Sequence, residues 1–312
     1  MAVTPPTGPP GDGWPTVARA ARSLPGTPVR MLCTDTAAGD QRGLVREPGS
    51  PARLPGMPPV PLYGARQVHG ARVLVVTGAF EAGAEVEAVA RAGMPSAGGA
   101  CDVEDVASVT GIGLNAGGLE HRLGKVLGVP GLDVAPWRWL DGSAPEGDAV
   151  VARGTGRAAV VLTADCVPLV VGSADGIFAA VHVGWRGLVA GVVEAVAETF
   201  ARLGARDPVA ALGPSIGPCC YGFSPEDLAV VARRTAGSGL STTRSGAPAL
   251  DLPAAVRSVA QASGLAVTAS REPCTACSGM YFSHRARRDE ARQATVVWCE
   301  TPHGRDQAVR CP

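Results

Sequence analysis

The chain has 312 residues, 46% of them hydrophobic, and a formal net charge of zero at pH 7. This composition predicts a globular protein with one large core or two modest ones, and the balanced charge argues against nucleic acid or an anionic membrane as a partner. No apolar run reaches the roughly 18 residues that span a bilayer, and the first 13 residues do not resemble a signal peptide, so a cytoplasmic protein is expected.

The cysteine content also favours a cytoplasmic protein. Nine cysteines, an odd number, occur in a long chain without an export signal. This pattern favours packed thiols or thiolate chemistry over a disulfide scaffold.

The first half of the chain contains few predicted elements. Residues 1–26, rich in proline and glycine, are expected to be a flexible lead, and residues 27–312 the globular domain. A strand is predicted at residues 29–34, and another over the β-branched run that ends at Val76, with His69 at its start. Helices are predicted at residues 80–92 and 117–127, and irregular structure at 128–147.

The second half is denser in regular elements. Short apolar runs predict strands at residues 148–151, 158–162, 167–171, 177–183, 209–212, 266–269 and 295–299. Amphipathic spacing and capping residues predict helices at 188–203, 225–234 and 252–263. Residues 213–221 are too rich in glycine and proline for regular structure, so a shaped loop is expected there.

The central strands carry polar residues that need partners. Asp165 and Cys166 separate two apolar strands, and His182 lies near the end of a third. Strict alternation places His182 on the same face as Phe178 and Ala180. A buried polar side chain without a partner costs about 1–3 kcal/mol, so these residues should be satisfied by each other, by the backbone or by a metal.

Arg186 follows the same strand, where the chain turns into a helix. Free N–H groups at a helix N-terminus attract anions, and a guanidinium adds two donors that suit phosphate. Arg186 and the adjacent Gly187 are therefore candidates for phosphate binding.

By residue type, Cys166 and His182 with one more histidine would form a zinc set that leaves a fourth position for water or substrate. The pair alone is also compatible with a packed thiol and a hydrogen-bonded histidine, since free cysteine is often buried.

Four sequence blocks, in this order, resemble the YfiH family, whose members are described as polyphenol oxidases or laccases and as purine nucleoside phosphorylases. The blocks are Gln67-Val68-His69-Gly70, Thr163-Ala164-Asp165-Cys166, His182-Val183-Gly184-Trp185-Arg186-Gly187 and Gly213-Pro214-Ser215-Ile216-Gly217-Pro218-Cys219-Cys220-Tyr221. The resemblance implies a single α+β domain with a central mixed sheet flanked by helices. It also implies metal binding by His69, Cys166 and His182.

The family resemblance implies phosphorolysis of adenosine, inosine and methylthioadenosine, with adenosine deamination as a further activity. The implied cofactor is zinc, with copper as the alternative, and the implied partners are purine nucleosides and phosphate, with no protein partner evident. Asp165, Cys166 and Arg186 are the catalytic candidates, and Tyr221 joins Arg186 and Gly187 as a binding candidate. Asp165 could orient a ligand histidine or transfer a proton, or it could cap the turn before Cys166.

The first half departs from the family pattern, because the block nearest to Leu-Asn-Leu-Gly follows His69 here instead of preceding it. Residues 77–146 are therefore either an insertion or a rearranged segment. The third ligand could be His69, His121 or absent, and a catalytically degenerate or cell-wall-editing member is an alternative, as is a copper-dependent phenol oxidase.

Further features have competing interpretations. Cys219 and Cys220 are expected to shape the loop, with a redox pair as the alternative; Cys274 and Cys277 have zinc-knuckle spacing but no second pair of matching spacing. The arginine-rich residues 285–292 could be a solvated turn or the edge of an anionic substrate site.

Overall fold

The computed structural model describes residues 21–42, 54, 57–58, 60–76, 134–136, 144–269 and 272–300. His121 and the predicted helices at residues 80–92 and 117–127 lie outside the described residues. In the described part of the chain, no helix is long and apolar enough to cross a membrane.

One sheet has five strands and mixed pairing. In spatial order they are β1 (Arg22–Ser23), β2 (Val29–Cys33), β14 (Gln293–Cys299), β7 (Ala158–Thr163) and β3 (Leu62–Gly64). All pairs are antiparallel except β3 with β7. The sheet therefore joins segments from both ends of the described chain.

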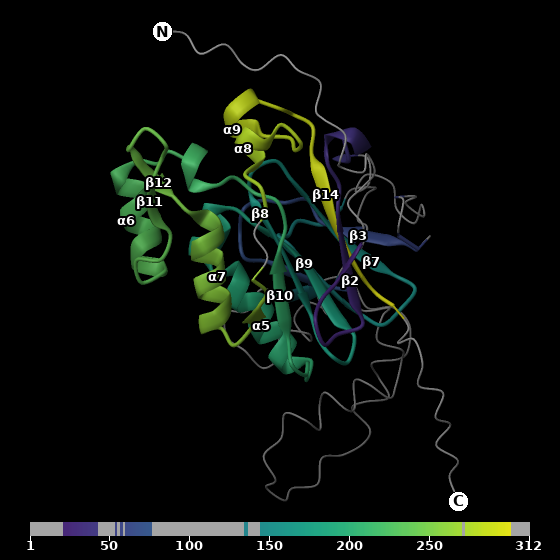
Figure 1. Cartoon of the computed structure of the whole chain (residues 1–312). Helices are drawn as coiled ribbons and strands as arrows, with labels where there is room; N and C mark the ends of the chain where they lie inside the picture. Colours follow the sequence, from purple (N-terminus) through teal and green to yellow (C-terminus); the bar gives the residue numbers. More distant parts are fainter. Residues whose placement is uncertain are drawn as a thin grey trace, which may run out of the picture.

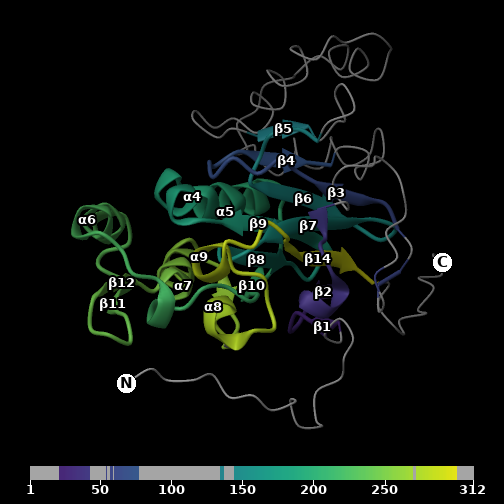
Figure 2. The same ribbon diagram turned by 90° about the horizontal axis from the view of Figure 1, so that it is seen from above.

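The second sheet has seven strands. In spatial order they are β13 (Ala266–Val267), β10 (Val209–Leu212), β8 (Val167–Gly172), β9 (Ile177–Val183), β6 (Ala149–Arg153), β4 (Val73–Val75) and β5 (Val134–Pro136). Figure 2 shows β4 and β5 at one edge of this sheet. A small third sheet pairs β11 (Leu240–Thr242) with β12 (Pro248–Leu250).

Helices cover the seven-stranded sheet on the face away from the five-stranded sheet, so the molecule has three layers (Figure 1). The helices of this layer are α4 (Trp185–Ala190), α5 (Val192–Arg202) and α7 (Leu252–Ala262), with α6 (Pro225–Arg234) packed against α4. The one-turn helices α8 (Thr275–Ser278) and α9 (His284–Arg287) lie beside each other outside this layer (Figure 1). Short 3-10 helices are η1 (Thr36–Ala38) and η4 (Pro218–Cys220). The apolar faces of α5 and α7 bury valines and a phenylalanine against the sheet.

Strand β9 is wholly buried and contributes to two cores. Ile177, Ala179 and Val181 pack in the core beneath the helices, whereas Phe178 and Ala180 pack between the two sheets. This alternation confirms the predicted facing of the strand. Full burial of a valine, isoleucine or phenylalanine side chain contributes about 1.5–3 kcal/mol, so the strand that carries His182 is among the best anchored in the molecule.

The α+β class is confirmed, but the strands form two mixed sheets where a single central sheet was expected. The chain passes from one sheet to the other between β7 and β8, at the turn that holds Cys166. Sequence periodicity identifies strands and not the sheet to which each belongs, so this division was not foreseen.

Three boundaries differ from the predictions. Arg22–Ser23 pairs with β2, and Leu24 is buried, so ordered structure begins before residue 26. The predicted helix over residues 188–203 starts at Trp185 and is interrupted by Gly191, whose φ of 94° is left-handed. Residues 134–136, expected to be irregular, form an edge strand beside β4.

Candidate metal centre and substrate cavity

Strand register brings three separate chain segments together at one end of the central strands of the seven-stranded sheet. Strands β8 and β9 are antiparallel, and Pro168 pairs with His182, so the turn that holds Cys166 lies at the end of β9. Strand β6 begins with Ala149 opposite Val181, and β4 runs parallel to β6. The residues just before β4 and β6 therefore lie at the same end of the strands as His182.

The side chains of His69, Cys166 and His182 meet there. Their ligand atoms all lie within 4.8 Å of one another, and the Cys166 Sγ is 3.8 Å from the His69 Nε2. The two imidazole rings lie nearly perpendicular, with centroids 4.7 Å apart. His182 is 3% exposed, whereas His69 lies on the surface, so the set is open on one side.

Asp148 holds both histidines in place. One carboxylate oxygen lies 2.8 Å from the His182 Nδ1 and accepts a hydrogen bond of 2.9 Å from the His69 backbone N–H. The other oxygen accepts a bond of 2.7 Å from the Gly70 N–H. His69 has a left-handed φ of 59°, which is uncommon for a residue other than glycine, and these bonds to Asp148 stabilise it.

The same contacts set the charges of the cluster. Burial raises the pKa of Cys166, but the nearby His182 and His69 lower it to about 6. Burial lowers the pKa of His182, but Asp148 and Cys166 raise it to about 9. Burial also raises the pKa of Asp148, yet the hydrogen bonds from His182 and Gly70 bring it below its ordinary value. At neutral pH the set therefore contains a thiolate beside an imidazolium.

Gly184 leaves room for the cluster. A Cβ atom at this position would lie 2.7 Å from the Cδ2 of His69 and 3.3 Å from the Sγ of Cys166. Any side chain larger than a hydrogen would push the His69 ring away from the other two donors.

The three residues fit a metal ion by their donor chemistry. His182 uses its Nδ1 for Asp148, which leaves Nε2 for coordination, and Cys166 is a thiolate at neutral pH. Two imidazoles and one thiolate are ligands suited to zinc, and a three-ligand set leaves one position for a substrate or water. The position of His69 in this set agrees with the predicted ligands, and the alternative His121 lies outside the described residues.

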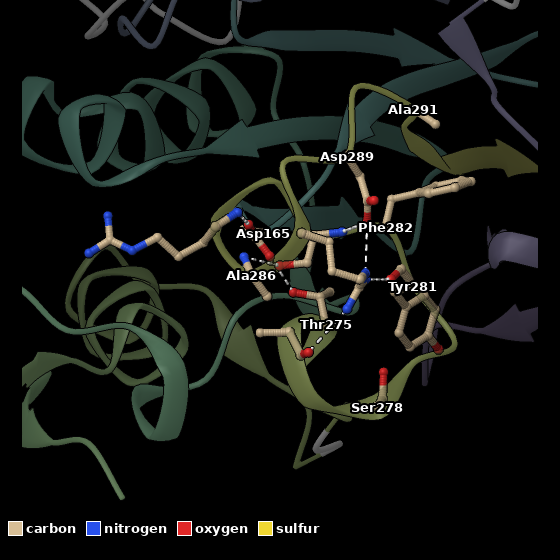
Figure 3. A network of polar contacts seen from close by, with 12 residues as sticks. Asp165, Thr275, Ser278, Tyr281, Phe282, Ala286, Asp289 and Ala291 are labelled. Carbon is tan, nitrogen blue, oxygen red and sulfur yellow. Dashed lines mark hydrogen bonds and ion pairs between the residues drawn. The ribbon is translucent and has the colours of Figure 1, made fainter. Parts of the chain in front are cut away.

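Asp165 does not contact either histidine. Its carboxylate accepts hydrogen bonds from the Thr275 hydroxyl (2.7 Å) and the Arg285 backbone N–H (2.6 Å), and its carbonyl accepts one from the Ile216 N–H (2.9 Å). Figure 3 shows Asp165 pointing into this network of the C-terminal segment. The carboxylate that orients a histidine is therefore Asp148 and not Asp165, the residue suggested by the sequence. Asp165 instead ties the Cys166 turn to two distant segments.

A cavity of about 580 Å³ opens beside the cluster. The residues that line it come from four regions of the chain and include three arginines: Ala65, Gln67, His69, Leu162, Thr163, Ala164, Asp165, Cys166, His182, Arg186, Tyr221, His284, Arg285 and Arg292. Among the predicted binding residues, Arg186 and Tyr221 line the cavity. Gly187 is buried beneath the His69 loop, where a Cβ would lie 3.1 Å from the Gly70 carbonyl oxygen.

The arginines differ in how firmly they are held. Arg285 donates from Nη2 to the Gly222 carbonyl (2.6 Å) and lies over the Tyr221 ring at 5.6 Å. Arg292 donates to three backbone carbonyls of its own loop. Arg186 is exposed and lies 4.7 Å over the Trp185 ring. Together they contribute three positive charges to the lining of the cavity.

Tyr221 offers an aromatic face and a protonated hydroxyl. Its ring packs edge-on against Phe223 with centroids 5.0 Å apart, and Phe223 packs in turn against Trp185. Burial and the nearby Cys166 thiolate raise the pKa of Tyr221. The phenol is therefore neutral at physiological pH and can donate a hydrogen bond.

Sequence reasoning missed several residues of the site. Asp148 could have been found because an acid directly before a wholly apolar strand needs a buried partner. The sequence marks Gln67 only as part of a motif, yet its side-chain amide pairs with both backbone groups of Leu162, at 2.7 and 2.8 Å. The sequence of residues 285–292 is compatible with a solvated turn or with the edge of a substrate site, and the structure places Arg285 and Arg292 at the cavity.

Comparisons with known proteins agree with this picture. Residues 121–300 match the family described as multi-copper polyphenol oxidoreductase laccase. The chain is 39% identical over 178 residues to a purine nucleoside phosphorylase of Streptomyces coelicolor, covering 55% of this chain and 73% of that protein. A Streptomyces griseus protein of the same name is 38% identical over 179 residues, covering 55% and 72%.

Solved structures show the same fold. A Neisseria meningitidis protein, NMB0706, superposes with a TM-score of 0.57 at 18% identity and covers 91% of this chain and 100% of that one. YfiH of Bacillus licheniformis superposes with a TM-score of 0.53 at 17% identity, covering 87% and 93%. With the family match over more than half of its length, the chain belongs to the YfiH family of laccase-domain proteins.

Proposed function

We propose that this protein is a zinc-dependent purine nucleoside phosphorylase that acts on adenosine, inosine and methylthioadenosine. The observation that carries the proposal is the convergence of the three donors His69, Cys166 and His182 with Arg186 and Tyr221 around one cavity. The cavity volume of about 580 Å³ falls in the range of small-molecule sites, about 300–1,000 Å³. The names of the Streptomyces relatives support the same reaction.

In this proposal His69, Cys166 and His182 hold zinc, which when bound would supply a positive charge that polarises a substrate oxygen. Asp148 keeps both histidines in position and favours the tautomer of His182 that leaves Nε2 free. Because this carboxylate has no exposed surface, water does not compete for these hydrogen bonds.

Arg186 would hold phosphate with its planar pair of donors, and Arg285 and Arg292 add positive charge at the same side. The phosphate oxygen attacks C1′ of the ribose, the bond from C1′ to N9 breaks, and the purine leaves with the electron pair and takes up a proton. Tyr221 would stack on the base or donate a hydrogen bond to it. Orientation of phosphate and nucleoside in one cavity supplies the main rate enhancement.

Asp165 is assigned a positioning function instead of proton transfer. Both carboxylate oxygens already accept hydrogen bonds from Thr275 and Arg285. These contacts hold the turn that presents Cys166, whereas a proton shuttle would need an oxygen that faces the substrate.

The test is release of base from inosine by the purified protein, with and without phosphate. We expect hypoxanthine and ribose 1-phosphate only when phosphate is present. Equal release of hypoxanthine without phosphate would mean hydrolysis and would contradict the phosphorylase mechanism.

Arg186→Gln provides the matched variant. Loss of a hydrogen bond to a charged ligand costs about 1.5–3 kcal/mol, so the KM for phosphate should rise about 10- to 150-fold. Arg206→Gln, at an exposed position after α5, is the control that should leave the KM unchanged. An unchanged KM in Arg186→Gln would remove Arg186 from the phosphate site.

Adenosine distinguishes phosphorolysis from deamination, because the first yields adenine and the second inosine. Zinc deaminases use a glutamate as the proton carrier, and no glutamate is among the described residues that line the cavity. Deamination therefore stays a prediction from the resemblance, and adenine is the expected product.

The name of the family points to a second activity, oxidation of phenols with copper. Multicopper sites use many histidines, whereas this chain has five in total, and the described ligand set suits one ion. Oxygen uptake on a phenol by copper-loaded protein would favour the oxidase over the phosphorylase. The close approach of the three donors supports an enzyme over a degenerate or cell-wall-editing member.

A further inference from the structure

A second cluster of sulfur atoms lies outside the candidate metal centre. Cys219 and Cys220 belong to η4, Cys274 directly precedes α8, and Cys277 lies within α8. The four Sγ atoms all lie within 4.8 Å of one another, although the two pairs are more than 50 residues apart in the chain. The helices α8 and α9 lie side by side near this point in both views (Figures 1 and 2).

The spacing of the sulfurs matches a tetrahedral ion. A zinc–sulfur bond of about 2.3 Å gives tetrahedral sulfurs that are about 3.8 Å apart. The Cys219 and Cys277 Sγ atoms are 3.9 Å apart, whereas a disulfide would require about 2.05 Å. All four cysteines are free thiols in the structure.

Hydrogen-bond donors lie close to two of the four sulfurs. The Gly217 backbone N–H donates to the Cys274 Sγ at 3.2 Å, and the Arg244 Nη2 lies 3.5 Å from the Cys277 Sγ. Both contacts bring a donor, one of them cationic, to a sulfur atom, and such second contacts are typical of metal-bound ligands.

We propose that Cys219, Cys220, Cys274 and Cys277 together bind one structural zinc ion. Four sulfur ligands close the coordination sphere, so this site has no position for a substrate, unlike the set at the cavity. An iron–sulfur cluster would spread its cysteines over several irons and needs wider separations than these sulfurs have. The inference does not depend on the proposed phosphorylase activity.

The ion would join the segment that carries the cavity residue Tyr221 to the segment whose Thr275 binds the Asp165 carboxylate. Ser215 and Cys274 form a parallel bridge, and the Thr275 N–H donates to the Ser215 carbonyl at 3.0 Å. Tyr221 directly follows one cysteine pair, and Thr275, which binds the Asp165 carboxylate, directly follows Cys274. Zinc at this site would therefore fix the cavity residue Tyr221 relative to the turn that presents Cys166.

The first experiment counts zinc per chain in full-length protein purified under argon. Wild type should carry two zinc ions when both sites are filled, and Cys166→Ala should retain one. Cys274→Ala should lose one ion relative to wild type, whereas Cys299→Ala, which removes a buried thiol far from both clusters, should lose none. A zinc-free Cys166→Ala protein would overturn the proposal.

X-ray absorption at the zinc edge provides a second measurement that needs no change in the four cysteines. The zinc retained by Cys166→Ala should have four sulfur neighbours at about 2.3 Å. Nitrogen or oxygen ligands, iron in place of zinc, or a disulfide between the two cysteine pairs in the argon-purified protein would each overturn the assignment. This readout remains decisive even if Cys274→Ala fails to fold.

Discussion

The molecule has two sulfur-containing ligand sets that are built in different ways. The set at the cavity combines Cys166 with two histidines, and strand register together with Asp148 holds its residues at the edge of a buried sheet. The four-cysteine set lies between a 3-10 turn and a one-turn helix, joined by few backbone contacts. The set of His69, Cys166 and His182, here called the open set, leaves one ligand position free and is held by the surrounding protein. The four-cysteine set, here called the closed set, offers four sulfur ligands and has few other contacts to hold it.

This difference suggests how each set depends on an ion. The His69, Cys166 and His182 donors are positioned by buried strands, so their arrangement should survive without metal. The four-cysteine set brings together two short segments that are otherwise joined by one β-bridge and by their shared contacts to Asp165. The free energy of zinc binding at the four cysteines should therefore contribute directly to the folding of these two segments, as in small metal-stabilised domains.

Asp148→Asn should have the largest effect and should act on the open set alone. Replacing one partner of a buried charge pair costs about 3–5 kcal/mol of the free energy of unfolding, and loss of such support weakens metal binding about 10- to 100-fold. Denaturant unfolding and metal analysis would measure both. Zinc in the four-cysteine set should remain.

Asp175→Asn is the control, since Asp175 also accepts a backbone hydrogen bond, from the Arg206 N–H, but lies at the opposite end of β9. If Asp148→Asn binds metal at the open set as tightly as wild type, the carboxylate does not organise that set.

The second prediction concerns the pH dependence of metal affinity at the open set. With the pKa of Cys166 at about 6 and that of His182 at about 9, the metal-free site in this interval is a thiolate with an imidazolium. Binding must then release one proton, so affinity should rise about tenfold per pH unit, or about 100-fold between about pH 6.5 and 8.5, and level off above pH 9.

Chelator competition measures this slope, with Cys166→Ala as the control for metal held elsewhere. In the four-cysteine set, burial and neighbouring sulfurs raise the pKa values of Cys219 and Cys220, so a steeper slope is expected there. A flat profile at the open set would show that His182 is not protonated in the metal-free protein.

Two glycine variants should have smaller effects, each confined to a different set. In Gly184→Ala the new Cβ would meet the His69 ring at 2.7 Å, which requires the ring to move. Overpacking of this kind costs about 1–3 kcal/mol, and we expect it as weaker metal binding at the open set. Gly217→Ala places a Cβ 3.3 Å from the Cys274 Cβ, so it should disturb only the closed set, and less strongly.

Zinc content and inosine phosphorolysis of the two variants would check this. If both variants lose the same amount of phosphorolysis activity, the two metal sets do not act independently, and the prediction is wrong.

Local elements could be predicted well because their signals are local. Ser224 caps α6 through the Asp227 N–H and Asp251 caps α7 through the Ala254 N–H, as the capping patterns indicated. The strand at Val209–Leu212 was predicted at its observed bounds. Caps, proline positions and apolar alternation act within a few residues, so a single sequence reveals them.

Long-range pairings could not be predicted in the same way. Asp148, whose carboxylate orients His182, lies 34 residues before it in the chain. The other histidine held by Asp148, His69, lies 79 residues from Asp148. The four cysteines illustrate the same limit, since the sequence offers no second pair whose spacing matches that of Cys274 and Cys277. Only the fold brings the η4 loop to α8, and no spacing rule relates residues 220 and 274.

The side chain of Gln67 acts as a substitute peptide group. Its amide makes the donor and acceptor contacts with Leu162 that a neighbouring strand residue would make, one residue before Thr163 ends β7. The position of His69 is thus determined by contacts to residues 148 and 162, and not by the length of chain that follows β4. Evolution or protein engineering could shorten or lengthen the segment from residue 77 to 133 without displacing the ligand, provided that enough chain remains to cross over between the parallel strands β4 and β5.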